Sequence, residues 1–353
     1  MFEGGLRKSW PYAAGLGFLL AAGGLFILLE PHIAPDLWQR GSTYAGAHWR
    51  RFLFGPGGRM ILMLAALMIM EVFFLEWQKT SICSIFFRRS RSSKADAAWA
   101  FLYFAHLQFF VETALTLGAA FGLSKLIGAG YTHLGWQRFE MPFHGPLAMA
   151  ATFVVFFLVS TFVAYWSHRL EHWRYFWHLH RYHHSATELN VLSGFRSNPV
   201  ESLVNALGLP LPLILLRMDD WTVIGLVMAY QSIATLQHSE LRWNFGWFGR
   251  WVIVSPQMHQ IHHSIDAEHK DRNFGVCPLW DHLFGTWYSG PNLPSGYGIP
   301  DPSHIERPVV QWLFDVWAFY RDAALWLRGL AGLGRSAPAL PPEPASPAGA
   351  SHS

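Results

Sequence analysis

Long apolar runs with few charges are the strongest constraint on how this chain folds. A helix needs about 20 apolar residues to cross the hydrocarbon core of a bilayer. Runs near this length lie at 11–29, 59–77, 97–123 and 144–166, and two shorter runs follow at 200–216 and 221–237. We interpret the first four as membrane spans and the last two as a hairpin that enters the membrane and returns. The sequence therefore predicts an all-α fold, a polytopic membrane helical bundle.

The composition agrees with a membrane location and excludes other classes. Only 14% of the 353 residues are charged, against about 25% in average soluble domains. The net charge of +3 comes from basic residues beside apolar runs, so no nucleic-acid partner is expected. The two cysteines, Cys83 and Cys277, form no closely spaced pair. A disulfide framework and a thiolate zinc site are therefore unsupported.

Basic residues between the second and third predicted spans set the orientation. The loop contains Lys79, Arg88, Arg89, Arg91 and Lys94, with no acid between Lys79 and Asp96. Because such loops stay on the cytoplasmic side, the N-terminus and the residues after the fourth span are predicted to be cytoplasmic. We expect a multi-pass protein of a bacterial inner membrane.

Four regions are predicted along the chain. They are an N-terminal transmembrane region at 1–140, a histidine-rich catalytic domain with a cytoplasmic helical cap at 141–308, an amphipathic helix at 309–335 and a disordered tail at 336–353. The amphipathic helix has the composition of a segment that lies on a membrane surface.

The 19 histidines are concentrated in a few places. His168 and His172 are four residues apart, and His238 stands alone after the hairpin. Two triplets share a three-and-four spacing: His180, His183 and His184, then His259, His262 and His263. On helices, each set can direct its imidazoles into one volume. One zinc ion needs three or four protein ligands, whereas these nine histidines are enough for two metals with four or five ligands each.

Ordinary structural roles explain the remaining histidines better than the clustered ones. We assign such roles to His32, His48, His106, His133 and His144, and a structural or supporting role to His178 and His282. The clusters lie among Trp, Phe and Leu. Burying so many imidazoles there is unfavourable unless a metal or hydrogen bonds satisfy them.

The motifs HRLEH, HRYHH and HQIHH resemble the histidine signature of the fatty acid hydroxylase/sterol desaturase superfamily. The stretch from Asp271 to Gly275, followed by Trp280 to Thr286, is similar to the closing signature of that family. The likeness covers about 150–300. Two departures are Arg196-Ser-Asn-Pro199, where a His-Pro pair is frequent, and His282, where Arg is common.

The resemblance implies a non-haem centre of two iron ions that uses O2 to attack a C–H bond of a lipid. Its ligands would be His168 and His172, then His180, His183 and His184, then His238, and finally His259, His262 and His263. His269, Asn198, Asp271 and Asn273 would be supporting residues or further ligands. Acceptors that orient the imidazoles would be Glu171, Glu188, Glu201, Glu240, Asp266 and Asp271. The apolar cavity is expected to be lined by residues such as Phe156, Phe157, Phe162 and Leu207.

Hydroxylation of a sterol, fatty acyl or alkyl lipid is the first functional prediction. Desaturation stays open, because both reactions begin by abstracting the same hydrogen. The chain has neither a G-x-G-x-x-G nor a C-x-x-C-H motif. Electrons are therefore expected from a separate protein, either cytochrome b5-like or a ferredoxin with its reductase.

Two other classes of protein fit the sequence less well. A membrane haem-binding protein would need isolated histidines in facing spans, and His106 alone is a poor match. A transport protein would often consist of repeated halves, and no internal repeat is visible. A zinc hydrolase would carry an H-E-x-x-H motif, which does not occur in this chain.

Overall fold

The computed structural model describes residues 56–330, apart from 106, 117, 136–138, 140–144, 205–219, 289, 291–292 and 307. Every regular element within these residues is helical, and an isolated bridge joins Ser264 to Tyr297. The all-α prediction is therefore confirmed for the described part of the chain. The predicted span at 11–29 and the tail at 336–353 lie outside the described residues.

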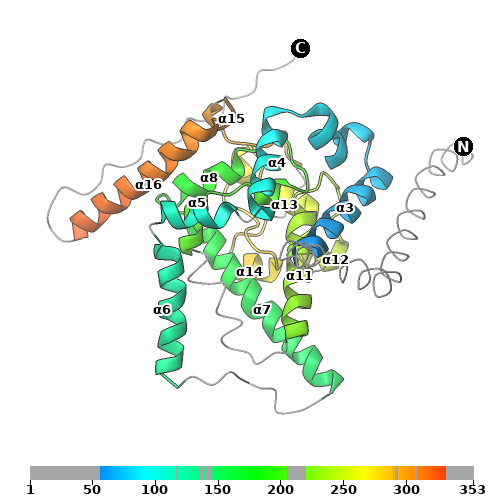
Figure 1. Ribbon diagram of the computed structural model, residues 1–353. Coiled ribbons are helices and arrows are strands. Elements are labelled where there is room, and N and C mark those ends of the chain that lie inside the picture. The colour runs from blue at the N-terminus through cyan, green and yellow to red at the C-terminus, as the bar shows by residue number, and fades with distance from the viewer. Residues whose placement is uncertain are drawn as a thin grey trace, which may run out of the picture.

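Six longer helices lie within the described part of the chain (Figure 1). They are α3 (Pro56–Phe74), α4 (Arg91–Phe104), α6 (Ala119–His133), α7 (Pro146–Glu171), α11 (Asp220–Gln237) and α16 (Pro308–Leu330). The shorter helices are α5 (Leu107–Leu115), α8 (Trp177–His184), α12 (Gly246–Trp251), α13 (Pro256–His262), α14 (Pro278–Leu283) and α15 (Ser303–Glu306). Short helical turns are η1 (Trp77–Lys79), η2 (Cys83–Arg88), η3 (Ser193–Phe195), η4 (Pro199–Glu201) and η5 (Ala267–His269). In Figure 1, α6, α7 and α11 extend downward from an assembly that contains α8 and α13.

Helix α7 is long and apolar enough to cross a membrane, as the prediction for 144–166 requires. It has 26 residues and begins with Pro146, whose fixed backbone angle suits the first helical position. Only 11% of its most apolar window is buried inside the molecule. No other described helix meets the same length and composition test. The multi-pass topology therefore stays a prediction.

The single span predicted at 97–123 is wrong. This stretch is divided among α4, α5 and α6, and the last of these begins after Gly118, whose φ is +75°. Helix α4 starts earlier than predicted, because the Ser90 hydroxyl caps it by accepting from the Ser93 N–H. Its buried face carries Asp96. A count of apolar residues does not detect the boundaries between these three helices.

The second predicted span, 59–77, corresponds to α3 and holds a buried acid. Glu71 is 1% exposed, and its carboxylate accepts from the Ser81 N–H and from the Ser239 hydroxyl. These bonds tie α3 to the segment after it and to the end of α11. Helix α11 matches the second arm of the predicted hairpin, whereas the turn before it lies outside the described residues.

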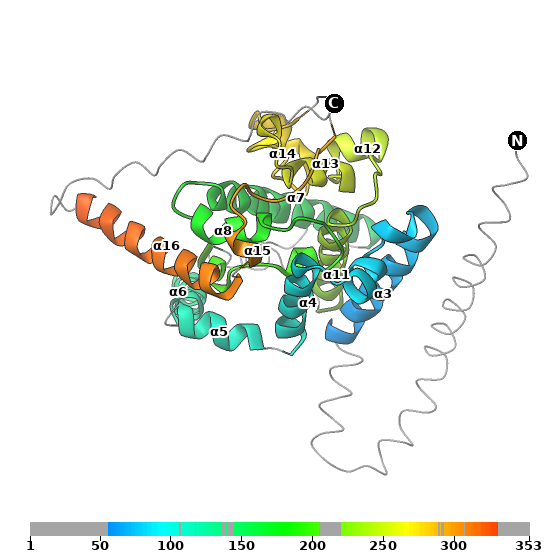
Figure 2. The ribbon, with the colours of Figure 1, turned by 90° about the horizontal axis from the view of Figure 1, so that it is seen from above.

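A core of apolar side chains supports α8 from its outer side. Leu179 packs with Val200, Val316 and Phe319, and the Trp99 indole donates to the Tyr182 hydroxyl. Helix α16 lies against α8, as Figures 1 and 2 both show. With this side held, α8 directs the histidines of its triplet away from α16, whereas His178 faces Asp322 of α16.

Candidate metal centre

Four segments bring the nine predicted histidines together. His168 lies in the last turn of α7, and His172 follows directly after that helix. Helix α8 carries the second triplet, and α13 with its C-terminal residue His263 carries the third. His238 follows α11. Segments nearly 100 residues apart in the chain therefore meet at one place.

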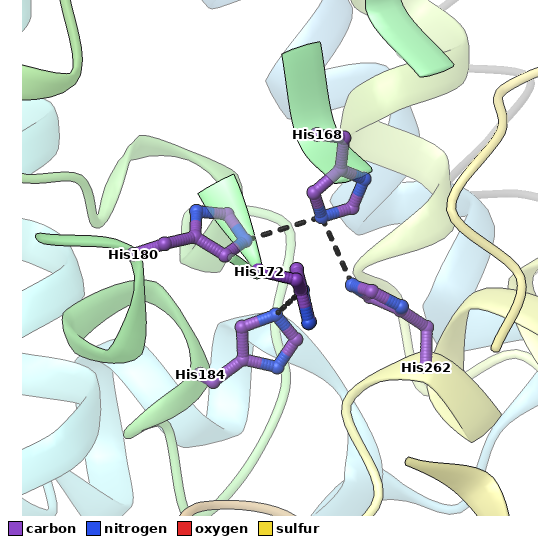
Figure 3. Close-up of side chains that lie close together, drawn as sticks. All are labelled: His168, His172, His180, His184 and His262. Atoms are coloured by element: carbon purple, nitrogen blue, oxygen red, sulfur yellow. Dashed lines mark hydrogen bonds between the residues drawn. The ribbon is translucent and has the colours of Figure 1, made fainter. Parts of the chain in front are cut away.

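The nine imidazoles form two groups whose ligand nitrogens lie within 4.8 Å of one another. The five-histidine cluster contains His168, His172, His180, His184 and His262 (Figure 3). The four-histidine cluster contains His183, His238, His259 and His263. That these residues bind metal stays a prediction, but the number in each group equals the four or five expected.

The members of each triplet are divided between the two clusters, whereas the sequence predicts that they share one volume. Residues four apart stay together, as His180 with His184 and His259 with His263 do. The third member of each triplet, His183 or His262, belongs to the other cluster. Successive helical residues are rotated by about 100°, so a residue beside an i, i+4 pair points elsewhere.

The two clusters adjoin. The rings of His184 and His263, one from each cluster, have centroids 4.5 Å apart with 27° between their planes. His183 and His184 are consecutive residues, as are His262 and His263, and both pairs contribute to both clusters. The two groups therefore form one continuous site.

Facing lone pairs in the five-histidine cluster indicate a cation. His168 Nδ1 donates to the Phe274 carbonyl at 2.8 Å, and His262 Nδ1 donates to the Arg272 carbonyl at 2.7 Å. A carbonyl only accepts, so in the neutral ring Nε2 carries no proton. Yet these two Nε2 atoms lie 3.0 Å apart. Two unprotonated nitrogens at this distance repel each other unless a positive ion lies between them.

The four-histidine cluster has the same arrangement. His183 Nδ1 donates to the Arg196 carbonyl, His238 Nδ1 donates to the Ala234 carbonyl, and their Nε2 atoms are 3.3 Å apart. Nitrogens about 2.1 Å from one ion and at right angles to each other are about 3.0 Å apart. Both clusters therefore fit a bound metal ion.

Protonation of these imidazoles is unfavourable, so a proton does not replace the metal ion between the facing nitrogens. Burial lowers the pKa of His262 and of His183 well below the usual value, and the nearby imidazoles His168 and His238 lower it further. Burial also lowers the pKa of His238. The imidazoles are therefore neutral near pH 7, which is the form that binds metals.

One loop orients three imidazoles of the five-histidine cluster. In addition to the carbonyls of Arg272 and Phe274, the Asp271 carboxylate accepts from His172 Nδ1 at 3.2 Å. Asp271 and Asn273 have φ values of +56° and +54°, a conformation that Asn and Asp tolerate better than most residues. The Asn273 side chain donates to the Met258 carbonyl and accepts from the Tyr288 N–H. Asp271 and Asn273, both predicted supporting residues, therefore lie in the loop that orients this cluster.

A buried charge network supports His183, and sequence reasoning missed it. Arg196 is completely buried and donates to the Asp96 carboxylate at 2.7 Å and to the Ser92 carbonyl. Its own carbonyl is the acceptor for His183. The signal in the sequence is a lone acid, Asp96, next to an apolar run.

Two of the predicted carboxylate acceptors face one histidine. Glu171 and Glu201 place oxygens 3.4 and 3.7 Å from His180 Nδ1, and both side chains are buried. Burial raises the pKa of Glu201 to about 8. Glu188, by contrast, pairs with Arg88 and Ser90.

Other predicted residues lie outside the two clusters. His269 is 1% exposed, and neither ring nitrogen has a hydrogen-bond partner. The Asn198 side chain accepts from the Val200 N–H and caps η4. His178 contacts Asp322, and His282 stacks between Trp251 and Trp287. Phe162 lies against Trp280; Leu207 and the histidines at 32, 48, 106 and 144 lie outside the described residues.

Comparisons with known proteins point to the same region. Residues 153–286 match the family model described as fatty acid hydroxylase. A methylsterol monooxygenase of Aspergillus fumigatus is 28% identical over 155 residues, 42% of this chain and 50% of the relative. An alkylglycerol monooxygenase of Caenorhabditis elegans is 25% identical over 161 residues, 43% of this chain and 29% of the relative. The chain therefore aligns with half or less of these relatives, and no solved structure matches it.

The fold and the site define a helical protein built around two adjoining polyhistidine clusters. Residues 153–286 match the fatty acid hydroxylase family model, so the resemblance to the fatty acid hydroxylase/sterol desaturase superfamily that the histidine motifs predict is confirmed over this stretch.

Proposed function

We propose that this protein is a membrane-embedded oxidoreductase that uses O2 to hydroxylate a C–H bond of a lipid. The observation that carries the proposal is the pair of adjoining clusters, each with unprotonated nitrogens that face one another. Both relatives named above are lipid monooxygenases. A sterol or an alkyl or acyl lipid is the substrate class that these relatives favour.

Iron is the metal that we propose for both clusters. Zinc has no redox chemistry, and its structural sites take four ligands, whereas one cluster here offers five imidazoles. Imidazole also suits iron. Bound iron would supply the activation of O2. The nine histidines would hold the two ions, with Nδ1 of five of them fixed by carbonyl or carboxylate acceptors.

The reaction needs electrons from outside the chain. Hydroxylation inserts one oxygen atom of O2 into the C–H bond and releases the other as water, which consumes two electrons and two protons. We propose that a separate donor protein, either cytochrome b5-like or a ferredoxin with its reductase, supplies the electrons on the cytoplasmic side. The active site and the N-terminus would both face the cytoplasm of a bacterial cell.

Lipid analysis of a deletion strain beside its parent tests the reaction. We expect the parent to contain a lipid with one more oxygen than its precursor, and the deletion strain to accumulate that precursor. A chain with His183→Ala should fail to restore the product, although it inserts normally. A difference of two hydrogens instead of one oxygen would favour desaturation.

Metal analysis of the purified protein tests the cofactor. Two iron ions per chain are expected. One zinc ion without iron, or unchanged lipids in the deletion strain, would contradict the proposal.

A further inference from the structure

Helix α16 exposes one apolar face and buries both of its acids. Asp315 and Asp322 are 0% and 6% exposed. Six apolar side chains of the same helix are between 48% and 69% exposed: Val309, Val310, Phe314, Trp317, Leu327 and Leu330. Because the inner face also holds the buried Val316 and Phe319, α16 is apolar on both sides, which is typical of a helix surrounded by protein or lipid rather than by water.

Contacts to neighbouring helices fix this orientation. Asp315 accepts from Arg181 Nε of α8 at 3.0 Å and interacts with His304 Nε2 of α15 at 2.6 Å. Asp322 lies 3.0 Å from His178 Nε2. Rotating α16 to bury its outer face would leave these buried partners unpaired, which is strongly unfavourable.

The charges on the outer side of α16 are positive. Its only acids are Asp315 and Asp322, both buried, whereas Arg321 and Arg328 are exposed. The Arg321 Nε also donates to the Asp322 carboxylate at 2.6 Å, which offsets part of its charge. The Arg321 guanidinium lies 4.8 Å from the centre of the Trp317 ring. Tryptophan beside arginine at the edge of an apolar face is typical of helices at a membrane interface, and the positive charge complements anionic headgroups.

The surface of α16 continues toward the helices that extend downward in Figure 1. The Tyr320 hydroxyl donates to the Leu115 carbonyl at the end of α5, and α5 contacts α6. Figures 1 and 2 place α16 beside the upper end of α6, which runs downward on the same side of the molecule as α7. The C-terminal end of α16 therefore lies near the level at which α7 would leave a bilayer, and the helix rises from there toward α15 (Figure 1).

We propose that the outer face of α16 lies in the boundary between headgroups and acyl chains of an anionic bilayer. The inference rests on the proposed membrane location of the chain. Because Asp315 and Asp322 contact α8, the helix that carries one histidine triplet, lipid binding by α16 sets the depth of the metal centre relative to the membrane.

Fluorescence quenching in vesicles tests the inference. Single cysteines that replace Trp317 or Leu327 are labelled in the full chain. The native Cys83 and Cys277 are buried, and the chain without an added cysteine gives the background. Val154→Cys, at a position of α7 that is 52% exposed, is the membrane control. Lys79→Cys, whose native side chain is 49% exposed, is the aqueous control.

We expect brominated lipid to quench the labels at 317 and 327 as it quenches the label at 154, and iodide to quench only the label at 79. Quenching by lipid should be stronger in vesicles that contain phosphatidylglycerol than in phosphatidylcholine alone, and Arg328→Gln should reduce that difference. Iodide quenching at 317 and 327 would overturn the inference. So would protection from both quenchers, which would mean that another copy, or residues 11–29 of the same chain, cover the face. Failure of the label at 154 would instead contradict the membrane location itself.

Discussion

The two histidine clusters have similar chemistry but different supports. In the five-histidine cluster, His172 is oriented by Asp271, whose side chain is 56% exposed and belongs to a loop. In the four-histidine cluster, His238, His259 and His263 are between 1% and 7% exposed, and His183 depends on the buried pair of Arg196 and Asp96. One histidine of the five-histidine cluster is therefore supported from the surface, whereas His183 of the four-histidine cluster is supported from the interior. We expect the five-histidine cluster to exchange metal more readily.

The largest effect should come from removing one ligand in turn from each cluster. His183 and His184 are consecutive residues of α8 that belong to different clusters, so His183→Ala and His184→Ala are a matched pair. Both should abolish turnover without preventing membrane insertion, and His172→Ala and His262→Ala should do the same. Since His183→Ala leaves three imidazoles and His184→Ala leaves four, iron content should fall further in the first, to about one ion per chain. Full activity in either variant would contradict the assignment of the clusters.

The next largest effect should come from the interior support. Asp96→Ala leaves the fully buried Arg196 without its carboxylate, and breaking a buried ion pair typically costs about 3–5 kcal/mol of stability. A marked drop in the thermal unfolding midpoint, with iron lost from the four-histidine cluster, is expected. Glu76→Ala is the control, because the 74% exposed Glu76 side chain pairs with Lys79 at the surface and is worth about 0–1 kcal/mol. Equal midpoints for the two variants would show that the network is dispensable.

A smaller effect should come from the surface support. Removing an acceptor that orients a ligand imidazole typically weakens metal binding about 10–100-fold. Asp271→Gly keeps the backbone conformation at φ +56° available while removing the carboxylate, and Asp271→Asn keeps an oxygen acceptor. Faster iron release to a chelator is expected for the glycine variant, with the asparagine variant in between. If the native chain and both variants release iron at the same rate, Asp271 does not position His172.

The smallest effect should be a difference in acid sensitivity between the clusters. Burial lowers the pKa of His184 and of His263 well below the usual 6.5, and the neighbouring imidazoles lower it further. Ligation needs neutral rings, so iron should be retained at pH 6.5 and released only as the pH falls further. Metal-free protein should lose stability below pH 6.5, where the unfolded chain binds more protons than the folded one. Because the Asp271 carboxylate that orients His172 is 56% exposed, whereas the Asp96 and Arg196 pair that supports His183 is fully buried, the five-histidine cluster should release iron first, within about one pH unit of the other. Release from both above pH 6.5 would contradict this prediction.

The sequence was sufficient to find the nine histidines, because spacing along a helix is a local property. Their division between two clusters follows from the same helical rotation, yet it becomes visible only when facing helices are known. His183 joins the cluster that contains His238, and His184 joins the cluster that contains His262. Because His238 and His262 come from distant segments, the spacing within α8 alone does not predict this assignment.

Buried charges were the part that the sequence did not reveal. Glu71 and Asp96 lie within or beside runs that were interpreted as spans, and their partners Ser239 and Arg196 are more than 90 residues away. The span at 97–123 failed for a related reason, since hydrophobic length does not record a left-handed glycine such as Gly118. Long-range pairing and backbone conformation leave little trace in composition.

The two neighbouring pairs, His183 with His184 and His262 with His263, constrain how the chain can change. Each pair divides its rings between both clusters, so inserting one residue ahead of either pair would turn both rings by about 100° at once. The geometry of one cluster therefore cannot change without a change in the other. Insertions and deletions are therefore tolerable in loops that hold no acceptor for an imidazole but not within the last turn of α8 or α13, and the spacing of the two clusters is inherited as a single unit.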